Sequence, residues 1–187
     1  MSRSIYSELF EIAVAHVLEL EGGTVNHKHD LGGHTNFGHS DAADGKRDGK
    51  IDLDGDGMGD VSPDELTLEQ AVDKYWRDYW IPCNCDNLPP ALALFVFDSA
   101  VNHGPAQAAR FLQVHVGVVV DLDIGPITCA RAKQFAHSES IALLFARRAH
   151  LYHGIVLANS TQAQFLNGWF KRLFKLQHFI VSNYFME

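Results

Sequence analysis

The 187-residue sequence has no long apolar run and no N-terminal leader pattern. No apolar stretch approaches the roughly eighteen residues that a membrane-spanning helix needs. The first residues also lack the basic region, apolar segment and cleavage site of a signal peptide. We therefore expect a protein that is made in the cytoplasm without a signal peptide and without stable membrane insertion.

Cysteine is scarce, and its spacing does not suggest a scaffold of disulfides. The three cysteines are Cys83, Cys85 and Cys129. An odd number without framework spacing, including one Cys-x-Cys pair, is a poor signal for disulfides, metal binding or redox chemistry. The sequence therefore predicts reduced thiols in or near the core.

Acidic residues outnumber basic ones, and most of this acidic excess lies in one segment of the chain. The formal net charge is -8. Residues 41–65 contribute -6 of it, from nine acids and three bases, whereas residues 91–187 carry eight bases and five acids, which is +3. This balance argues against a nucleic-acid-binding protein and leaves room for a basic face on the C-terminal half.

Helical spacing of apolar residues dominates the sequence. The first expected helix covers residues 4–20, and Gly22-Gly23 ends it. A loop or short hairpin follows up to Ser40 because glycines and small polar residues dominate there. The further expected helices begin at Thr67, with Gln70 completing a capping box, at Pro89-Pro90 up to Asn102, at Pro105 up to Gly117, near 127–136, near 139–157, and from about Ser160 to Tyr184. The predicted fold class is mainly α, in one domain.

Two carboxylates with different surroundings stand out near the first helix end. Glycoside hydrolysis needs one carboxylic acid that protonates the leaving oxygen and a second group that attacks the sugar or activates water. Glu21 follows the last apolar helical turn, where partial burial favours the protonated acid, and Asp30 lies in a polar, glycine-rich turn that favours the ionised form. Thr35 could orient a water molecule. By spacing alone this set is a weak signal.

Several motifs together resemble glycoside hydrolase family 108, which contains phage endolysins and related N-acetylmuramidases. The N-terminal motifs are Glu21-Gly22-Gly23 and Asp30-Leu31-Gly32-Gly33-His34-Thr35-Asn36-Phe37-Gly38. Further motifs are Tyr75-Trp76-Arg77-Asp78-Tyr79-Trp80, Phe97 to Pro105, Ile124 to Thr128 and Gly168-Trp169. The sequence departs from the family pattern at Thr24, where an aromatic residue is usual, and at His39-Ser40, where Ile-Thr is usual.

The resemblance implies a lysozyme-like fold with a small N-terminal loop or hairpin lobe and a helical C-terminal lobe. Residues 1–90 would form the catalytic part, with the insertion 41–65, and residues 91–187 a helical peptidoglycan-binding part of the same domain. It implies Glu21 as catalytic acid, with Asp30 and Thr35 as base and water-orienting group. We place the substrate-binding residues within the same motifs, at Asn36, Phe37 and Asn102.

The function that the resemblance implies is that of an endolysin-type muramidase, a monomer that hydrolyses the bond between N-acetylmuramic acid and N-acetylglucosamine in bacterial peptidoglycan. The protein would be made in the host cytoplasm and act on the wall, in the periplasm, after its release. Two alternatives stay open. One is a lytic transglycosylase, which uses a lone glutamate, and the other is a non-catalytic, calcium-dependent wall-binding protein.

The acidic insertion has the spacing of an EF-hand calcium loop. Asp52, Asp54, Asp56 and Asp60 occupy positions one, three, five and nine, and Gly57 occupies position six. Position seven, Met58, would offer its backbone carbonyl. Position twelve is Pro63, so Asp64 or Glu65 would have to supply the last carboxylate. The pattern predicts one structural calcium ion at this loop.

Overall fold

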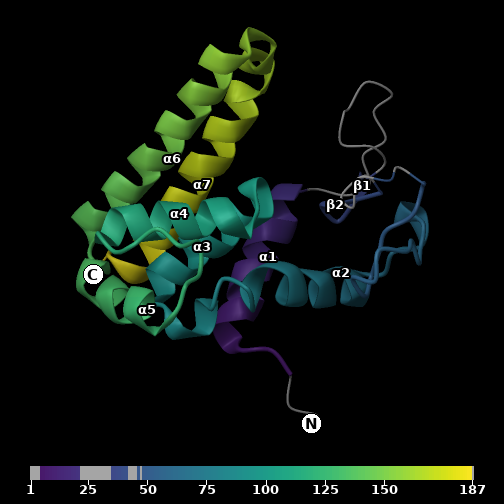
Figure 1. Ribbon diagram of the computed structural model, residues 1–187, viewed down its shortest axis with the longest axis horizontal. Helices are drawn as coiled ribbons and strands as arrows, with labels where there is room; N and C mark the ends of the chain where they lie inside the picture. The colour runs from purple at the N-terminus through teal and green to yellow at the C-terminus, as the bar shows by residue number, and fades with distance from the viewer. Residues whose placement is uncertain (1–4, 22–34, 42–45, 47, 187) are drawn as a thin grey trace. The chain divides into compact units, whose positions relative to one another are not determined.

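The computed structural model describes residues 5–21, 35–41, 46 and 48–186, and these residues are mostly helical (Figure 1). The α-helices of this part are α1 (Glu8–Glu21), α2 (Leu68–Tyr75), α3 (Pro90–His103), α4 (Pro105–Val116), α5 (Pro126–Ala132), α6 (Ser138–Ala158) and α7 (Leu166–Tyr184). Strands β1 (Thr35–Asn36) and β2 (His39–Ser40) form a two-stranded antiparallel sheet. Short 3-10 turns cover Pro63–Glu65, Cys85–Asn87, Lys133–Phe135 and Ser160–Phe165, and a π-helical turn covers Trp76–Trp80. The mainly α class is confirmed.

The chain divides into two compact units, residues 1–78 and residues 79–187. The first unit holds α1, the hairpin, the acidic insertion and α2. Helix α2 begins at the predicted capping box: the Thr67 side chain accepts a hydrogen bond from the Gln70 N–H, and the Gln70 side chain accepts one from the Thr67 N–H. Such a box satisfies two backbone donors that the first helical turn leaves without partners.

An aromatic cluster joins the two ends of the first unit. The Phe10 ring lies 4.8 Å from the ring of Trp76 and 5.2 Å from that of Tyr6, measured between centroids. The Tyr6 hydroxyl donates to Asp73 on α2. Edge-to-face aromatic packing of this kind adds about 0.5–1.5 kcal/mol per pair beyond simple burial. It fixes the start of α1 against the last turn of α2.

Helix α3 is the core of the second unit. All ten residues from Ala91 to Ala100 are buried. A helix that is apolar on every side must be covered on every side, which is why the other helices of this unit surround it. Gly104, with φ of 83°, ends α3, and Pro105 begins α4 at the corner that the sequence predicts. The three cysteines are free and buried, as predicted.

A buried ion-pair cluster on Asp98 ties three helices of this unit together. The Asp98 carboxylate lies 2.5 Å from Arg148 Nη1 on α6 and 2.9 Å from Arg172 Nη2 on α7. Burial alone would raise the pKa of Asp98, but the guanidinium groups of Arg172 and Arg148 outweigh it and keep the pKa below its ordinary value. The charges are thus compensated inside the core.

The C-terminal helices α6 and α7 run side by side as an antiparallel pair (Figure 1). The predicted last helix from Ser160 needs correction, because Ser160–Phe165 is a 3-10 turn and α7 begins only at Leu166. Asn159 explains the difference: its side chain accepts from the Thr161 N–H at 3.1 Å and caps the tighter turn. Within the described ranges, none of these helices combines the length and apolar character needed to cross a membrane.

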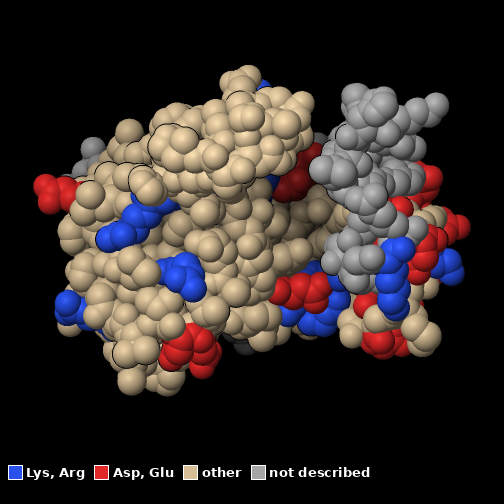
Figure 2. All heavy atoms as spheres, turned by 45° about the horizontal axis from the view of Figure 1, so that its top comes forward, with Lys and Arg blue, Asp and Glu red and all other residues tan. Residues whose placement is uncertain are grey.

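The two units differ in surface charge (Figure 2). On the smaller unit, acidic and basic side chains lie close together. The larger unit presents a broad uncharged area at the top of the view, with Lys and Arg side chains set apart from one another below it. This agrees with the sequence, since residues 149–170 contain no Asp, Glu, Lys or Arg.

Candidate active site

The predicted acid Glu21 is the last residue of α1 and lies directly against the hairpin. Its side chain is half-buried. A Cβ atom built on Gly38 would lie 2.8 Å from Cγ and 3.1 Å from Cδ of Glu21, and it would also collide with the Tyr75 hydroxyl. Carbon atoms in contact are normally about 3.5–4.0 Å apart. The Glu21 carboxyl group, the Gly38 backbone and the Tyr75 hydroxyl therefore share one small space that only glycine leaves open.

The turn between β1 and β2 brings Gly38 into this position. Phe37 and Gly38 both have positive φ, 49° and 78°, as a two-residue turn of type I′ requires. Glycine adopts this conformation freely, whereas Phe37 is strained, which costs on the order of 1–3 kcal/mol. The Tyr75 hydroxyl compensates by donating to the Phe37 carbonyl at 2.8 Å. The Phe37 ring packs against a small apolar cluster of Ile51, Leu66 and Ala71.

One face of the hairpin is buried and fixed by hydrogen bonds. Asn36 Nδ2 donates to the Pro63 carbonyl at 2.8 Å, and the His39 ring bonds through Nε2 to the Ala71 carbonyl at 3.0 Å. Burial lowers the pKa of His39 to about 4, so its imidazole is neutral at pH 7 and Nε2 can donate. His39 is buried and packs against Tyr75, with ring centroids 4.3 Å apart and ring planes tilted by 45°.

The other face of the hairpin carries the predicted water-orienting residue. Thr35 pairs with Ser40 and Asn36 with His39. Because side chains alternate along a strand, Thr35 and Ser40 stand on the face opposite Asn36 and His39, where both are half-buried. The predicted base Asp30 lies outside the described residues. The structure thus places Glu21 against the turn of the hairpin whose first residue is Thr35.

The predicted substrate-binding residues lie in three different settings. The Asn36 side chain donates to the Pro63 carbonyl, and Phe37 is the first of the two turn residues between β1 and β2. Asn102 belongs to the second unit, in the last turn of α3, where Nδ2 lies 3.5 Å from the Tyr152 hydroxyl. That hydroxyl accepts from Arg148 Nε at 2.8 Å, so Asn102 stands at the edge of the Asp98 cluster. The roles of these residues in substrate binding stay predictions.

The acidic loop brings three of the predicted calcium ligands together. Carboxylate oxygens of Asp52, Asp54 and Asp60 lie within 4.8 Å of one another. Ligands of one calcium ion lie about 2.3–2.6 Å from it, hence up to about 5 Å from one another, so this spacing fits. The Asp56 carboxylate is not part of this group and accepts instead from the Met58 N–H at 2.7 Å.

Backbone N–H groups shape this loop around Asp52. Gly55 donates to its carboxylate at 2.6 Å and Gly57 at 2.9 Å, and both glycines have a φ of 83°. The N–H of Gly55, aided by that of Gly57, lowers the pKa of Asp52, which keeps the carboxylate ionised. The predicted last ligand, Glu65, accepts from the Ser62 hydroxyl at 2.8 Å and lies in the 3-10 turn that follows the loop.

Gly38 and Tyr75 are the site residues that reading the sequence missed. In the sequence Tyr75 stands out only as the first residue of the motif that ends at Trp80, and nothing local shows that its hydroxyl reaches a carbonyl 38 residues away. Gly38 carried one usable signal, because a glycine at the tip of a short predicted hairpin points to a turn with positive φ. The contact with Glu21 depends on the fold and has no local signature.

Comparison with known proteins shows the family of the chain. Residues 14–104 match the family described as glycosyl hydrolase 108, and this range includes Glu21, Thr35 and Asn102. The chain is similar over almost its whole length to a solved structure described as that of SagA from Brucella abortus: 31% of residues are identical, the match covers 92% of this chain and 94% of that chain, and the TM-score is 0.77. None of the curated proteins matches the chain.

The chain therefore belongs to glycosyl hydrolase family 108, as the motifs suggest. It is a glycoside hydrolase, and the predicted mainly α, lysozyme-like fold is confirmed.

Proposed function

We propose that the protein is a muramidase that hydrolyses the bond between N-acetylmuramic acid and N-acetylglucosamine in bacterial peptidoglycan. The observation that carries the proposal is the half-buried Glu21 carboxyl group held against the turn at Gly38. A carboxylic acid fixed at a helix end beside a hairpin suits protonation of a glycosidic oxygen.

In the proposed mechanism Glu21 donates its proton to the leaving oxygen while Asp30 accepts a proton from the attacking water. The Thr35 hydroxyl, on the half-buried face of the hairpin, orients that water. The rigid turn keeps Glu21 in place, which matters because acid catalysis depends on the position of the proton donor as well as on its acidity.

Glu21→Gln is the direct test. An amide has the same shape but cannot donate the required proton, so release of reducing sugars from purified sacculi should fall by at least about 100-fold, with unchanged melting behaviour. Glu19→Gln, two residues earlier on the same helix, is the control and should retain activity. Near-native turnover of the Glu21 variant would show that another group supplies the proton, whereas a native chain that binds sacculi without releasing reducing sugars would support the non-catalytic, calcium-dependent wall-binding protein.

The products separate hydrolysis from the rival lytic transglycosylase reaction. Hydrolysis leaves a reducing N-acetylmuramic acid end, whereas transglycosylation leaves an anhydro-sugar, and mass spectrometry of the digested muropeptides distinguishes the two. Asp30→Asn should also slow a hydrolase strongly. An anhydro-sugar product with an active Asp30 variant would favour the lone-glutamate mechanism.

We propose that the biological role is lysis of a bacterial host by a monomeric enzyme that is made in the cytoplasm and reaches the periplasmic wall after release. The family resemblance supports this role. Expression in the cytoplasm with and without a separate pore-forming protein tests it: lysis should require both. Lysis by a catalytically inactive variant would contradict a role based on wall hydrolysis.

We also propose that one structural calcium ion binds the acidic loop through Asp52, Asp54 and Asp60, with Asp56, the Met58 carbonyl and Glu65 as the remaining predicted ligands. The ion would neutralise carboxylates that otherwise repel one another and would order a glycine-rich segment. It would stabilise the first unit without taking part in the reaction.

Titration calorimetry and melting curves with and without calcium test this proposal. Calcium should raise the melting temperature by mass action, and Asp54→Asn combined with Asp60→Asn should remove both the heat of binding and the shift. Asp48→Asn, which changes a charge of the same insertion outside the ligand pattern, is the control. The absence of any calcium-dependent heat or shift in the native chain would refute the proposal.

A further inference from the structure

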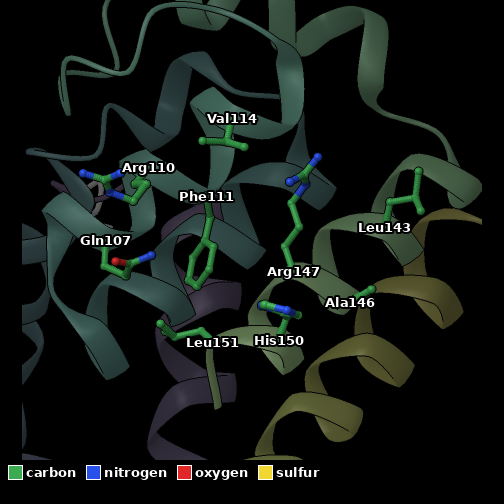
Figure 3. A pocket seen from close by; sticks show the side chains of 9 residues that line it. All are labelled: Gln107, Arg110, Phe111, Val114, Leu143, Ala146, Arg147, His150 and Leu151. Carbon is green, nitrogen blue, oxygen red and sulfur yellow. The ribbon is translucent and has the colours of Figure 1, made fainter. Parts of the chain in front are cut away.

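A groove of about 610 Å³ lies in the second unit between α4 and α6 (Figure 3). Phe111, Val114 and Leu143 contribute to its apolar lining. Val114 and Leu143 keep 42% and 63% of their side-chain surface exposed, so much of this apolar surface faces water. Exposed apolar surface of this extent in a concave site is typical of a place where a ligand binds.

Two arginines flank the groove. Figure 3 shows Arg110 from α4 and Arg147 from α6 on either side of the Phe111 ring. Both are exposed, and neither forms a hydrogen bond or ion pair with another residue in the described part of the chain. Among the described residues that line the groove, none carries a carboxylate. The guanidinium groups are therefore available to a ligand.

The surrounding sequence strengthens the preference for an anion. Residues 140–186, which include nearly all of α6 and the whole of α7, contain no Asp or Glu. Of their five Lys and Arg residues, Arg148 and Arg172 are paired with Asp98, so the positive charge at the groove comes from the two arginines of its lining. His150, which also lines the groove, adds a hydrogen-bonding group without negative charge. The groove thus combines an apolar lining with two guanidinium groups and no carboxylate.

We propose that this groove binds the peptide stems of peptidoglycan, an inference that rests on the proposed function. The stems are short peptides with small apolar side chains and several free carboxylates. Arginine binds carboxylates through two parallel hydrogen bonds, and the apolar lining suits methyl groups. In the intact wall the lactyl carboxyl group of N-acetylmuramic acid forms the amide bond to the stem, so there the glycan itself offers no carboxylate to the arginines. The second unit would therefore recognise the peptide part of the wall while the first unit cleaves the sugar.

Sedimentation with purified sacculi tests the proposal in full-length chains that carry Glu21→Gln. The groove variant adds Arg110→Gln and Arg147→Gln. The matched control adds Lys171→Gln and Lys175→Gln, two exposed cations on α7 with the same total change of charge. Each protein is mixed with intact sacculi, alone or with an excess of one of two soluble competitors: the stem peptides or the glycan strands that an amidase releases by cutting between muramic acid and L-alanine.

The groove variant should bind intact sacculi about tenfold more weakly than its parent, because it loses two charge-assisted contacts. The lysine control should bind like the parent. Soluble stem peptides should displace the parent from the sacculi, and soluble glycan strands should not reduce the difference between the parent and the groove variant. Leu143→Ser, a change at an exposed apolar position of the lining, should weaken binding to intact sacculi without altering the charge.

Three results would overturn the proposal. Equal weakening by the arginine and lysine changes would indicate general electrostatic attraction, and displacement of the parent by glycan strands but not by stem peptides would assign the groove to the sugar. Unchanged sacculus binding, with loss of binding to vesicles of anionic phospholipid, would assign it to a lipid. Because binding is measured without turnover, these results remain separate from the proposed muramidase activity, which the digestion assay tests independently.

Discussion

Replacing Gly38 with alanine perturbs the proposed active site by a single methyl group. The new Cβ would lie 2.8 Å from Cγ of Glu21, where contacting carbons need about 3.5 Å or more. It would also collide with the Tyr75 hydroxyl. Tyr75 is buried, and its hydroxyl bonds to the Phe37 carbonyl, so the more exposed Glu21 side chain is the group that must yield.

The structure allows the loss of turnover and the loss of stability of Gly38→Ala to be estimated separately. A displacement of Glu21 by roughly 0.7–1 Å should lower turnover by on the order of 100-fold, because misplacement of about 1 Å has that effect on catalysis. The φ of 78° at Gly38 adds strain for alanine, which should lower the free energy of unfolding by about 1–2 kcal/mol. The collision with the buried Tyr75 hydroxyl should add a further loss of about 1–3 kcal/mol. The activity loss is therefore larger than the stability loss explains.

Gly117→Ala is the matched control. Gly117 has a φ of 73°, and no described side chain or backbone atom lies within 4 Å of a Cβ built there. In urea unfolding, Gly117→Ala should lower the free energy of unfolding only by the strain of the positive φ, about 1–2 kcal/mol. Its release of reducing sugars per folded molecule should be native. Native turnover in folded Gly38→Ala protein would refute the view that the contact between the turn and Glu21 positions the catalytic acid.

Two further substitutions test buried titratable groups, Asp98 and His39. Asp98→Asn should lower the free energy of unfolding by about 3–5 kcal/mol, because it leaves the buried charges of Arg148 and Arg172 uncompensated; urea unfolding measures this against Asp123→Asn at an exposed carboxylate, and equal small losses would contradict it. For His39 the folded pKa of about 4 lies below the ordinary 6.5, so the unfolded chain takes up the proton first. The stability contribution of the neutral ring is complete above about pH 6.5 and should fall by up to about 3 kcal/mol as the pH drops to about 4. Between about pH 6.5 and pH 4, the free energy of unfolding of the native chain should therefore fall by up to about 3 kcal/mol more than that of the His39→Gln variant. Parallel pH curves for the two proteins would refute the lowered pKa of His39.

Local signals predicted much of the helical framework. The capping box at Thr67 and the corner at Gly104 and Pro105 occur as the sequence indicates, because each depends on a few neighbouring residues. The turn after Asn159 was missed although it is also local, since apolar spacing across Ser160–Phe165 does not distinguish a 3-10 turn from a helix. Caps and turn chemistry decide such boundaries.

The interactions that define the sites could not be predicted in the same way. Arg148 is fully buried, although charged residues are rarely buried without a partner, and its partner Asp98 lies 50 residues earlier. The contact between Glu21 and Gly38 and the hydrogen bond from Tyr75 to Phe37 likewise join distant segments. Residue types could therefore nominate Glu21 as an acid, but only the fold shows what holds it.

Helix α2 connects the acidic loop to the proposed active site through two consecutive residues. Lys74 Nζ donates to the Asp52 carbonyl at 2.8 Å, and the next residue, Tyr75, donates to the Phe37 carbonyl of the turn. Neighbouring residues of a helix point in directions about 100° apart, so one rigid turn of α2 holds both the loop and the hairpin. Any change that loosens the loop would shift α2, then the turn, and then the Glu21 side chain that rests on it. Loss of order in the acidic loop should therefore reduce turnover through the placement of the acid, while the chemical groups of the reaction remain intact.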